Sequence, residues 1–166
     1  MRFKTLTFVM LLSLSLTSWA QTYASDSLLD WKEVEAPPPP AFNVNKLLTF
    51  DVLKASSLTF GVDPASISIG EDEVVRYVIV ATSPTGVRNV FYEGIRCATG
   101  EYKTYARQNN EGVWNKVSNP EWRSVFNNAG ARHVLQFAKT AACDNTAPTR
   151  TVDEMVHNLK TNRITR

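Results

Sequence analysis

The clearest structural signal in the chain is residues 74–116, VVRYVIVATSPTGVRNVFYEGIRCATGEYKTYARQNNEGVWNK. Its β-branched and aromatic runs predict strands at 74–82, 87–98, 101–107 and 113–116. Short turns rich in Gly, Pro and Asn separate these runs, at 83–86, 99–100 and 109–112. Such short loops join only antiparallel neighbours, so the stretch predicts an antiparallel meander. Its first strands are apolar on both faces, which requires cover on both sides or strong curling.

The turn lengths set an expected register for the long strands. A four-residue loop at 83–86 places Arg76 opposite Glu93, and a two-residue loop at 99–100 places Glu93 opposite Ala106. The same face would also carry a set of apolar residues: Val74, Val78, Val80, Phe91, Ile95 and Cys97. Buried opposite charges must pair, because an isolated buried charge is strongly destabilising. We therefore expect a buried Arg76–Glu93 ion pair, either purely structural or part of a polar site in a sheet cavity.

The other face of the expected sheet collects cations and aromatic rings toward its margins. These residues are Arg88, Tyr92, Arg96, Lys103, Tyr105 and Arg107. On an exposed sheet they could bind an anionic or glycan ligand through bidentate hydrogen bonds and stacking. The alternatives are a solvated face and, for Tyr105, simple cover of Gly94, which lies opposite it in this register.

Shorter elements flank the meander. Upstream, alternation and turn residues predict strands at 47–53, 57–62 and 66–69. Downstream, residues 119–121 (Asn-Pro-Glu) are typical of a helix start, and residues 131–142 fit either a helix or a strand. Thr151 and Glu154 form a capping box that opens a last helix. The pattern predicts an α+β fold, with a curled antiparallel meander of about five to seven strands packed by two or three C-terminal helices.

The first twenty residues have the features of a secretory signal peptide. Arg2 and Lys4 precede an apolar run at 5–16, which is too short for a membrane-spanning helix, and small residues precede the expected cleavage between Ala20 and Gln21. Cleavage removes 20 of 166 residues and two of 18 basic residues, which leaves 16 basic and 16 acidic residues. We therefore expect a periplasmic protein without a stable membrane anchor and without the basic excess that attracts nucleic acid.

Residues 21–40 are predicted to be a flexible N-terminal arm ahead of a single α+β domain at 41–166. The arm ends in four consecutive prolines at 37–40, which favour a stiff polyproline II conformation. Trp31 either belongs to a disordered terminus or docks on the domain or on a partner.

Cys97 and Cys143 are the two cysteines of the chain. In an exported protein they indicate one disulfide, which would stabilise the fold by about 4 kcal/mol in the chain-entropy model. A free thiol pair or a metal site is disfavoured, because the chain has no C-x-x-C motif and no histidine near either cysteine. We expect no metal and no cofactor.

The run at 92–103, YEGIRCATGEYK, together with residues 62–66 (VDPAS) and 70–72 (GED), resembles the cryptic neisserial protein-like family. The resemblance covers about residues 28–160. It implies an exported envelope protein of a Gram-negative bacterium, of uncharacterised function and without catalytic residues to carry over. Some relatives look like lipoproteins, but this chain has no cysteine near the cleavage site.

Sequence motifs for catalysis are absent from the chain. It has no G-x-S-x-G turn and no phosphate-binding glycine loop, and its two histidines, His133 and His157, have no ligand spacing. The acidic run at 71–73 lacks the spacing of a calcium loop. We therefore expect a non-catalytic binding or envelope-assembly module whose partner is an envelope protein or an anionic or glycan ligand. The alternative is a small periplasmic hydrolase that acts on cell-wall or glycan material through Glu93 and a second carboxylate.

Overall fold

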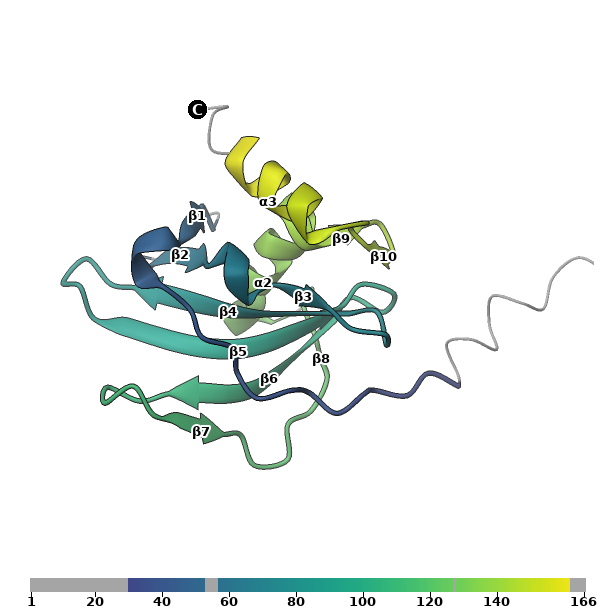
Figure 1. Ribbon diagram of the computed structural model, residues 1–166, viewed down its shortest axis with the longest axis horizontal. Helices are drawn as coiled ribbons and strands as arrows, with labels where there is room; N and C mark the ends of the chain where they lie inside the picture. Colours follow the sequence, from purple (N-terminus) through teal and green to yellow (C-terminus); the bar gives the residue numbers. More distant parts are fainter. Residues whose placement is uncertain (1–29, 53–56, 127, 162–166) are drawn as a thin grey trace, which may run out of the picture. The chain divides into compact units, whose positions relative to one another are not determined.

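An eight-stranded antiparallel sheet forms the centre of the computed structural model, which describes residues 30–52, 57–126 and 128–161 (Figure 1). Its strands are β1 (Leu48–Phe50), β2 (Thr59–Val62), β3 (Ser68–Ile69), β4 (Val74–Thr82), β5 (Arg88–Arg96), β6 (Glu101–Gln108), β7 (Trp114–Lys116) and β8 (Arg123–Ser124). The main path is β1-β2-β4-β5-β6-β7, with β3 paired to β4 and β8 paired to β6. The predicted meander is confirmed, and the sheet has one strand more than the upper end of the expected range.

Two helices follow the sheet, which confirms the α+β fold. They are α2 (Arg132–Phe137), which continues into a π-helical turn, η4 (Ala138–Ala142), and α3 (Val152–Thr161). Residues 131–142, which the sequence left open, are therefore helical. Thr151 caps α3 as predicted, because its hydroxyl accepts a hydrogen bond from the Glu154 amide at 3.1 Å. Short 3-10 turns, η1 (Val44–Lys46), η2 (Pro64–Ser66) and η3 (Ala129–Ala131), and a small hairpin of β9 (Cys143–Asp144) and β10 (Ala147–Pro148) complete the described elements.

The Cys97–Cys143 disulfide forms as expected. It joins the turn after β5 to the end of η4, and so fixes the helical layer to the centre of the sheet.

The helix expected from residue 119 does not form. Asn119 has a φ of 51°, in the left-handed region, whereas a helix N-cap needs an extended backbone. The chain continues as β8, which pairs with the start of β6, and the Val125 amide then donates to the Gly100 carbonyl at 3.0 Å. The sheet edge thus uses backbone groups that a helix would have paired internally.

The register of β4 and β5 differs from the prediction by one residue. Thr82 pairs with Arg88, so the connection has five residues, 83–87, and Val87, which follows Gly86 with its φ of 86°, is the extra one. Arg76 therefore lies opposite Gly94, and Glu93 lies opposite Tyr77. Because a one-residue slip inverts the faces, Arg76 and Glu93 project from opposite sides of the sheet.

The connection between β5 and β6 is also longer than predicted. Arg96 pairs with Glu101, which leaves four residues in the turn, and Glu93 lies opposite Thr104 in place of Ala106. A β-bulge then shifts the register, so that Tyr92 pairs with Ala106 and Tyr105 is the extra residue.

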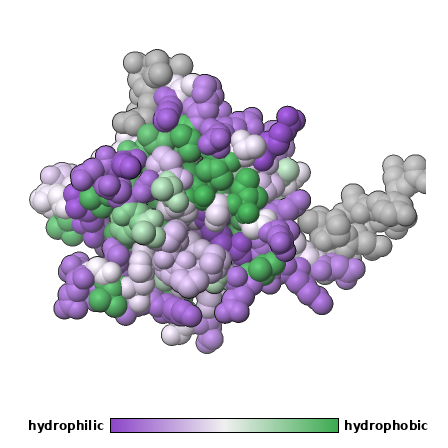
Figure 2. Space-filling model, viewed as in Figure 1, coloured by the Kyte–Doolittle hydropathy of each residue, from purple (hydrophilic) through white to green (hydrophobic). Residues whose placement is uncertain are grey.

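Two apolar clusters lie on the two sides of the sheet. The helical face, with Tyr77, Ile79 and Ile95, packs against α2, η4 and α3. The opposite face, with Val78, Val80 and Tyr92, packs against Ala36, Phe42 and Leu47 of the preceding segment. This cover on both sides, one of the two arrangements expected from the sequence, explains why β4 is buried at every position except Thr82. Figure 2 shows apolar residues gathered in the upper half of the view, where α3 lies, and hydrophilic residues around the periphery.

The segment that covers the second face is residues 31–42, here called the arm, and that face is called the arm face. The compact unit begins at Trp31 and not at residue 41. Residues 31–40, part of the arm expected at 21–40 to precede the domain, therefore belong to the same compact unit as the sheet. The signal peptide expected at 1–20 lies outside the described residues. Within the described ranges, no helix is both long enough and apolar enough to cross a membrane.

Candidate binding site

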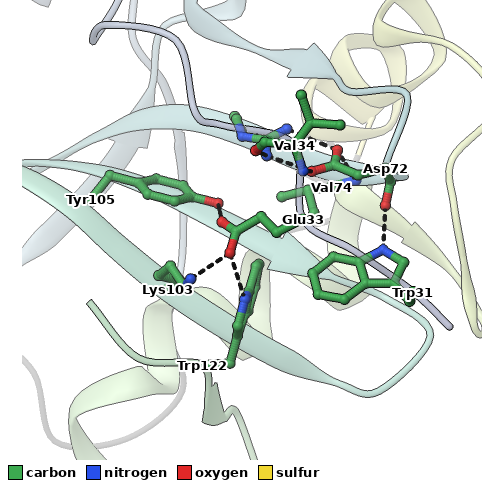
Figure 3. Close-up of polar contacts among 9 residues, drawn as sticks. Trp31, Glu33, Val34, Asp72, Val74, Lys103, Tyr105 and Trp122 are labelled. Carbon is green, nitrogen blue, oxygen red and sulfur yellow. Dashed lines mark hydrogen bonds and ion pairs between the residues drawn. The ribbon is translucent and has the colours of Figure 1, made fainter. Parts of the chain in front are cut away.

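The arm docks on the sheet through two carboxylates, one from each partner (Figure 3). The first belongs to Glu33 of the arm. It accepts hydrogen bonds from Lys103, from the Tyr105 hydroxyl at 2.8 Å and from the Trp122 indole nitrogen at 3.0 Å. Lys103 and Tyr105 are two residues apart on β6 and lie on the same face, and the bulge at Tyr105 brings its ring toward the arm. Three donors from the sheet and the following loop thus converge on one anionic group.

The second carboxylate belongs to Asp72, in the turn before β4. It accepts two hydrogen bonds from the Arg76 guanidinium, at 2.6 and 2.9 Å, and one from the Val34 amide at 2.9 Å. The Arg76 guanidinium in turn donates to the Val34 carbonyl at 3.0 Å, and the Trp31 indole donates to the Asp72 carbonyl at 2.9 Å. Residues 31–34 are therefore held at three points within one extended stretch.

Asp72 and Arg76 are both almost fully buried. Burial by itself would raise the pKa of Asp72, but the hydrogen bonds from Arg76, Val34 and Val74 outweigh it and hold that pKa below its ordinary value. Burial likewise opposes the charge on Arg76, and the contact with Asp72 reverses this effect and raises its pKa. Both groups are therefore charged, and each depends on the other.

Trp31 lies in an aromatic slot. The Arg96 guanidinium is stacked over its ring at 3.8 Å, and the Trp122 ring meets it edge-on at a centroid distance of 5.8 Å. The Nε and Nη2 atoms of Arg96 are buried and have no hydrogen-bond partner among the described residues. The arm therefore offers Arg96 an aromatic ring but not an acceptor.

A pocket of about 440 Å³ lies beside these contacts, between the arm and the sheet. The arm lines one side of it from Glu33 to Pro39, and Tyr92, Lys103, Tyr105 and Lys116 line the other. Prolines and tyrosines give it apolar walls, and two lysines supply positive charge. Burial and the contact with Glu33 raise the pKa of Tyr105, so its hydroxyl keeps its proton and remains a donor.

The six cationic and aromatic residues predicted to share a face do not all lie together. Tyr92, Arg96, Lys103 and Tyr105 lie on the arm face, where Tyr105 also covers Gly94 as the sequence suggested. Arg107 lies on the helical face, with its guanidinium over the Phe91 ring at 5.3 Å. Arg88 is exposed at the start of β5, outside these contacts.

The predicted Arg76–Glu93 ion pair does not form, because the register places the two residues on opposite faces. Glu93 instead lies in a buried polar network on the helical face. Its carboxylate contacts the His133 Nε2 atom at 3.1 Å, and accepts hydrogen bonds from Tyr77 at 3.2 Å and Thr104 at 3.3 Å. Burial, together with Glu93, raises the pKa of Tyr77 well above its ordinary value, so Tyr77 stays a donor.

Glu33, Trp122, Asp72 and His133 were not assigned to these sites from the sequence, whereas docking of Trp31 on the domain is one of the alternatives that the sequence leaves open. A signal for the arm does exist, because Trp31 and Glu33 are two residues apart and share a face of any extended segment. No comparable signal marks His133, whose partner Glu93 lies 40 residues away. Among the described residues, no cluster of three or more acidic, histidine or cysteine side chains could hold a metal ion.

Comparison with known proteins identifies a family. The model of the CNP1-like family matches residues 26–160, which is most of the chain and includes the arm, the whole sheet and both cysteines. No curated protein and no solved structure matches significantly.

Proposed function

We propose that this chain, which belongs to the CNP1-like family, is exported to the periplasm of a Gram-negative bacterium and acts there as a non-catalytic binding or envelope-assembly module. The features of a signal peptide at 1–20 support export. The disulfide supports an oxidising compartment, because disulfides persist mainly outside the cytosol.

The observation that carries the binding role is the way the sheet holds the arm. The Glu33 carboxylate of the arm accepts hydrogen bonds from Lys103, Tyr105 and Trp122. The Arg96 guanidinium stacks on the indole of Trp31. A face with these groups can recognise an extended segment through hydrogen bonds to its carboxylate and through stacking on its aromatic ring. The adjoining pocket, with Lys116 at its rim, gives a partner a place to begin contact.

Site-specific crosslinking in intact cells tests this role. A photoreactive amino acid replaces Lys116 in the pocket, and a control variant carries it at His157, which is exposed on α3. We expect a discrete crosslinked species from position 116 and none from position 157. Equal crosslinking at both positions, or none at 116, would contradict the binding role.

Fractionation of the same cells tests the location. We expect the protein in the osmotic-shock fraction, with an intact mass that lacks residues 1–20. Full-length protein in the cytoplasmic fraction would contradict export.

One contact favours a second candidate, a small periplasmic hydrolase acting on cell-wall or glycan material. Glu93 and His133 form a carboxylate–imidazole pair of a kind that enzymes use for proton transfer. The second carboxylate expected for this chemistry is not among the described side chains that contact Glu93, namely Tyr77, Thr104 and His133. The Glu93 variant described in the Discussion separates the two candidates.

A further inference from the structure

Three hydrogen-bond donors surround the Glu33 carboxylate, and all three lie outside the arm. Lys103 and Tyr105 are fixed on β6 by the ladders to β5 and β7, and Trp122 immediately precedes β8, which pairs with β6. The backbone that carries these donors is therefore ordered by the sheet and does not depend on the arm. If the arm leaves, the donors remain in place as an unfilled carboxylate site.

The slot that holds Trp31 is built in the same way. Arg96 ends β5, and Trp122 forms the opposite wall. With the arm docked, two buried nitrogen atoms of Arg96 have no acceptor in the part of the chain that the structure describes. A buried donor without a partner is destabilising, so the arm does not satisfy all the donors of the slot. A ligand with an additional oxygen acceptor beside its aromatic ring could pair with Arg96 and bind more tightly than the arm.

We infer that the arm face is a recognition site for an extended peptide segment of another envelope protein, one that has an aromatic residue followed two positions later by an acidic residue. Trp31 and Glu33 occupy this site as a built-in ligand, and the partner segment replaces them. The inference rests on the proposed binding function. It adds the class of ligand, an extended peptide, and the displacement of the arm that makes the site accessible. The spacing follows from the extended backbone, in which residues i and i+2 share a face.

Tethering favours the arm, because a short linker gives it an effective concentration in the millimolar range. An external segment must therefore make additional contacts. Tyr92 and Lys116 on the sheet side of the pocket of about 440 Å³, and the two Arg96 nitrogen atoms without a partner among the described residues, provide them.

The test follows the indole N–H signal of Trp122 by NMR, because this group donates directly to the occupant carboxylate. The protein is the full chain with the substitutions Trp31→Ala and Glu33→Ala, which leave the donors in place and empty the site. The probe is the peptide acetyl-Trp-Lys-Glu-Val-amide, and the control peptide has glutamine in place of glutamate. A Trp122→Phe variant assigns the signal.

We expect the probe to shift the Trp122 signal saturably in the double variant. The glutamine peptide should bind at least tenfold more weakly, and the wild-type chain should bind the probe at least tenfold more weakly than the double variant. Adding Lys103→Met should weaken the probe at least tenfold. Adding Tyr105→Phe keeps the aromatic ring but removes the hydroxyl donor, and should weaken binding of the probe severalfold. This variant serves as the test if the Lys103 variant does not fold.

Two results would overturn the inference. The first is a folded double variant that binds neither peptide, or binds both equally. The second is a wild-type chain that is dimeric by light scattering and whose Trp122 signal depends on protein concentration, which would assign the site to the arm of a second copy. Crosslinking at position 116 without peptide binding would leave the proposed function standing with another ligand class. Peptide binding without crosslinking would contradict the proposed function but not the site.

Discussion

The helical face and the arm face of the sheet are both closed, but by different interactions. On the helical face, Phe137 of α2 contacts Tyr77 and Phe50 through rings, and a disulfide fixes the layer covalently. On the arm face, an extended segment is held by Glu33 and Asp72 through charged hydrogen bonds. Apolar packing resists changes of pH and salt, whereas charged contacts depend on both. One face therefore maintains the fold, and the other has the character of a contact that can be exchanged.

The largest effect should come from removing apolar packing on the helical face. Phe137 is fully buried, and its ring lies 4.5 Å from that of Tyr77. Phe137→Ala should lower the free energy of unfolding by about 3–5 kcal/mol, because it leaves a cavity in the core. Denaturant unfolding measures the loss. An effect below about 1 kcal/mol would mean that this layer does not carry the fold.

A smaller loss is expected from the buried charges behind the arm. Asp72→Asn leaves the Arg76 charge buried without its counter-ion, and should lower the free energy of unfolding by about 3 kcal/mol. The Trp31 environment should change as well, since Asp72 also holds Val34 of the arm. Fluorescence and denaturant unfolding measure the two effects together, and Glu71→Gln, next in sequence and exposed, is the matched control.

The same pair gives the arm face a pH dependence of known sign. The folded pKa of Asp72 lies below its ordinary value, so its stabilising contribution is fully present above about pH 4. It is lost as the pH falls through the folded pKa. The wild-type chain should therefore lose stability on acidification in excess of the Asp72→Asn variant. Parallel stability curves between pH 5 and pH 2 would contradict this assignment.

Glu93→Gln tests the polar network inside the helical face. It removes the charge that Tyr77, Thr104 and His133 contact, and should cost about 2 kcal/mol of stability. Under the binding function, the variant keeps its crosslinked partner in cells. A loss of glycan- or cell-wall-cleaving activity in a variant of unchanged stability would instead support the hydrolase.

The smallest effect belongs to the arm itself. Glu33→Gln should lower the free energy of unfolding by about 1.5 kcal/mol, because a neutral amide replaces the charged acceptor of three donors in a partly solvated site. The Trp122 indole signal should nevertheless move, since its acceptor loses charge. Added salt should weaken arm contacts in the wild-type chain more than in the variant. If Glu33→Gln lowered the free energy of unfolding as much as Phe137→Ala does, the arm face would maintain the fold as the helical face does, and the two faces would not differ in role.

The sequence predicts the meander and the disulfide because both depend on local signals. Runs of β-branched residues and short turns define β4 to β7, and two cysteines in a chain that is expected to be exported have one way to pair within it. The length of the turn between β4 and β5 is not predicted correctly, and one extra residue next to Gly86 places Arg76 and Glu93 on opposite faces. The prediction that buried charges are paired holds, but each has a different partner.

The sequence predicts the residues that the sheet contributes to the candidate site, but not those that come from distant segments. Arg96, Lys103 and Tyr105 lie on one stretch, and their alternation shows that they could share a face. The groups that fill the site come from elsewhere: Glu33 lies 70 residues from Lys103 and 89 residues from Trp122. Contacts over such separations leave no periodic trace, so the four prolines predict a linker where the structure has a segment packed on the sheet.

The position of the arm at the start of the described chain has a consequence for the order of assembly. A ribosome makes residues 31–42 before any of their partners, and the last of these, Trp122, is synthesised 89 residues after Glu33. Until then the four prolines keep the segment extended and unable to join a helix. Because contacts between distant residues form late, the arm should be the last segment to dock on the sheet and the first to leave it.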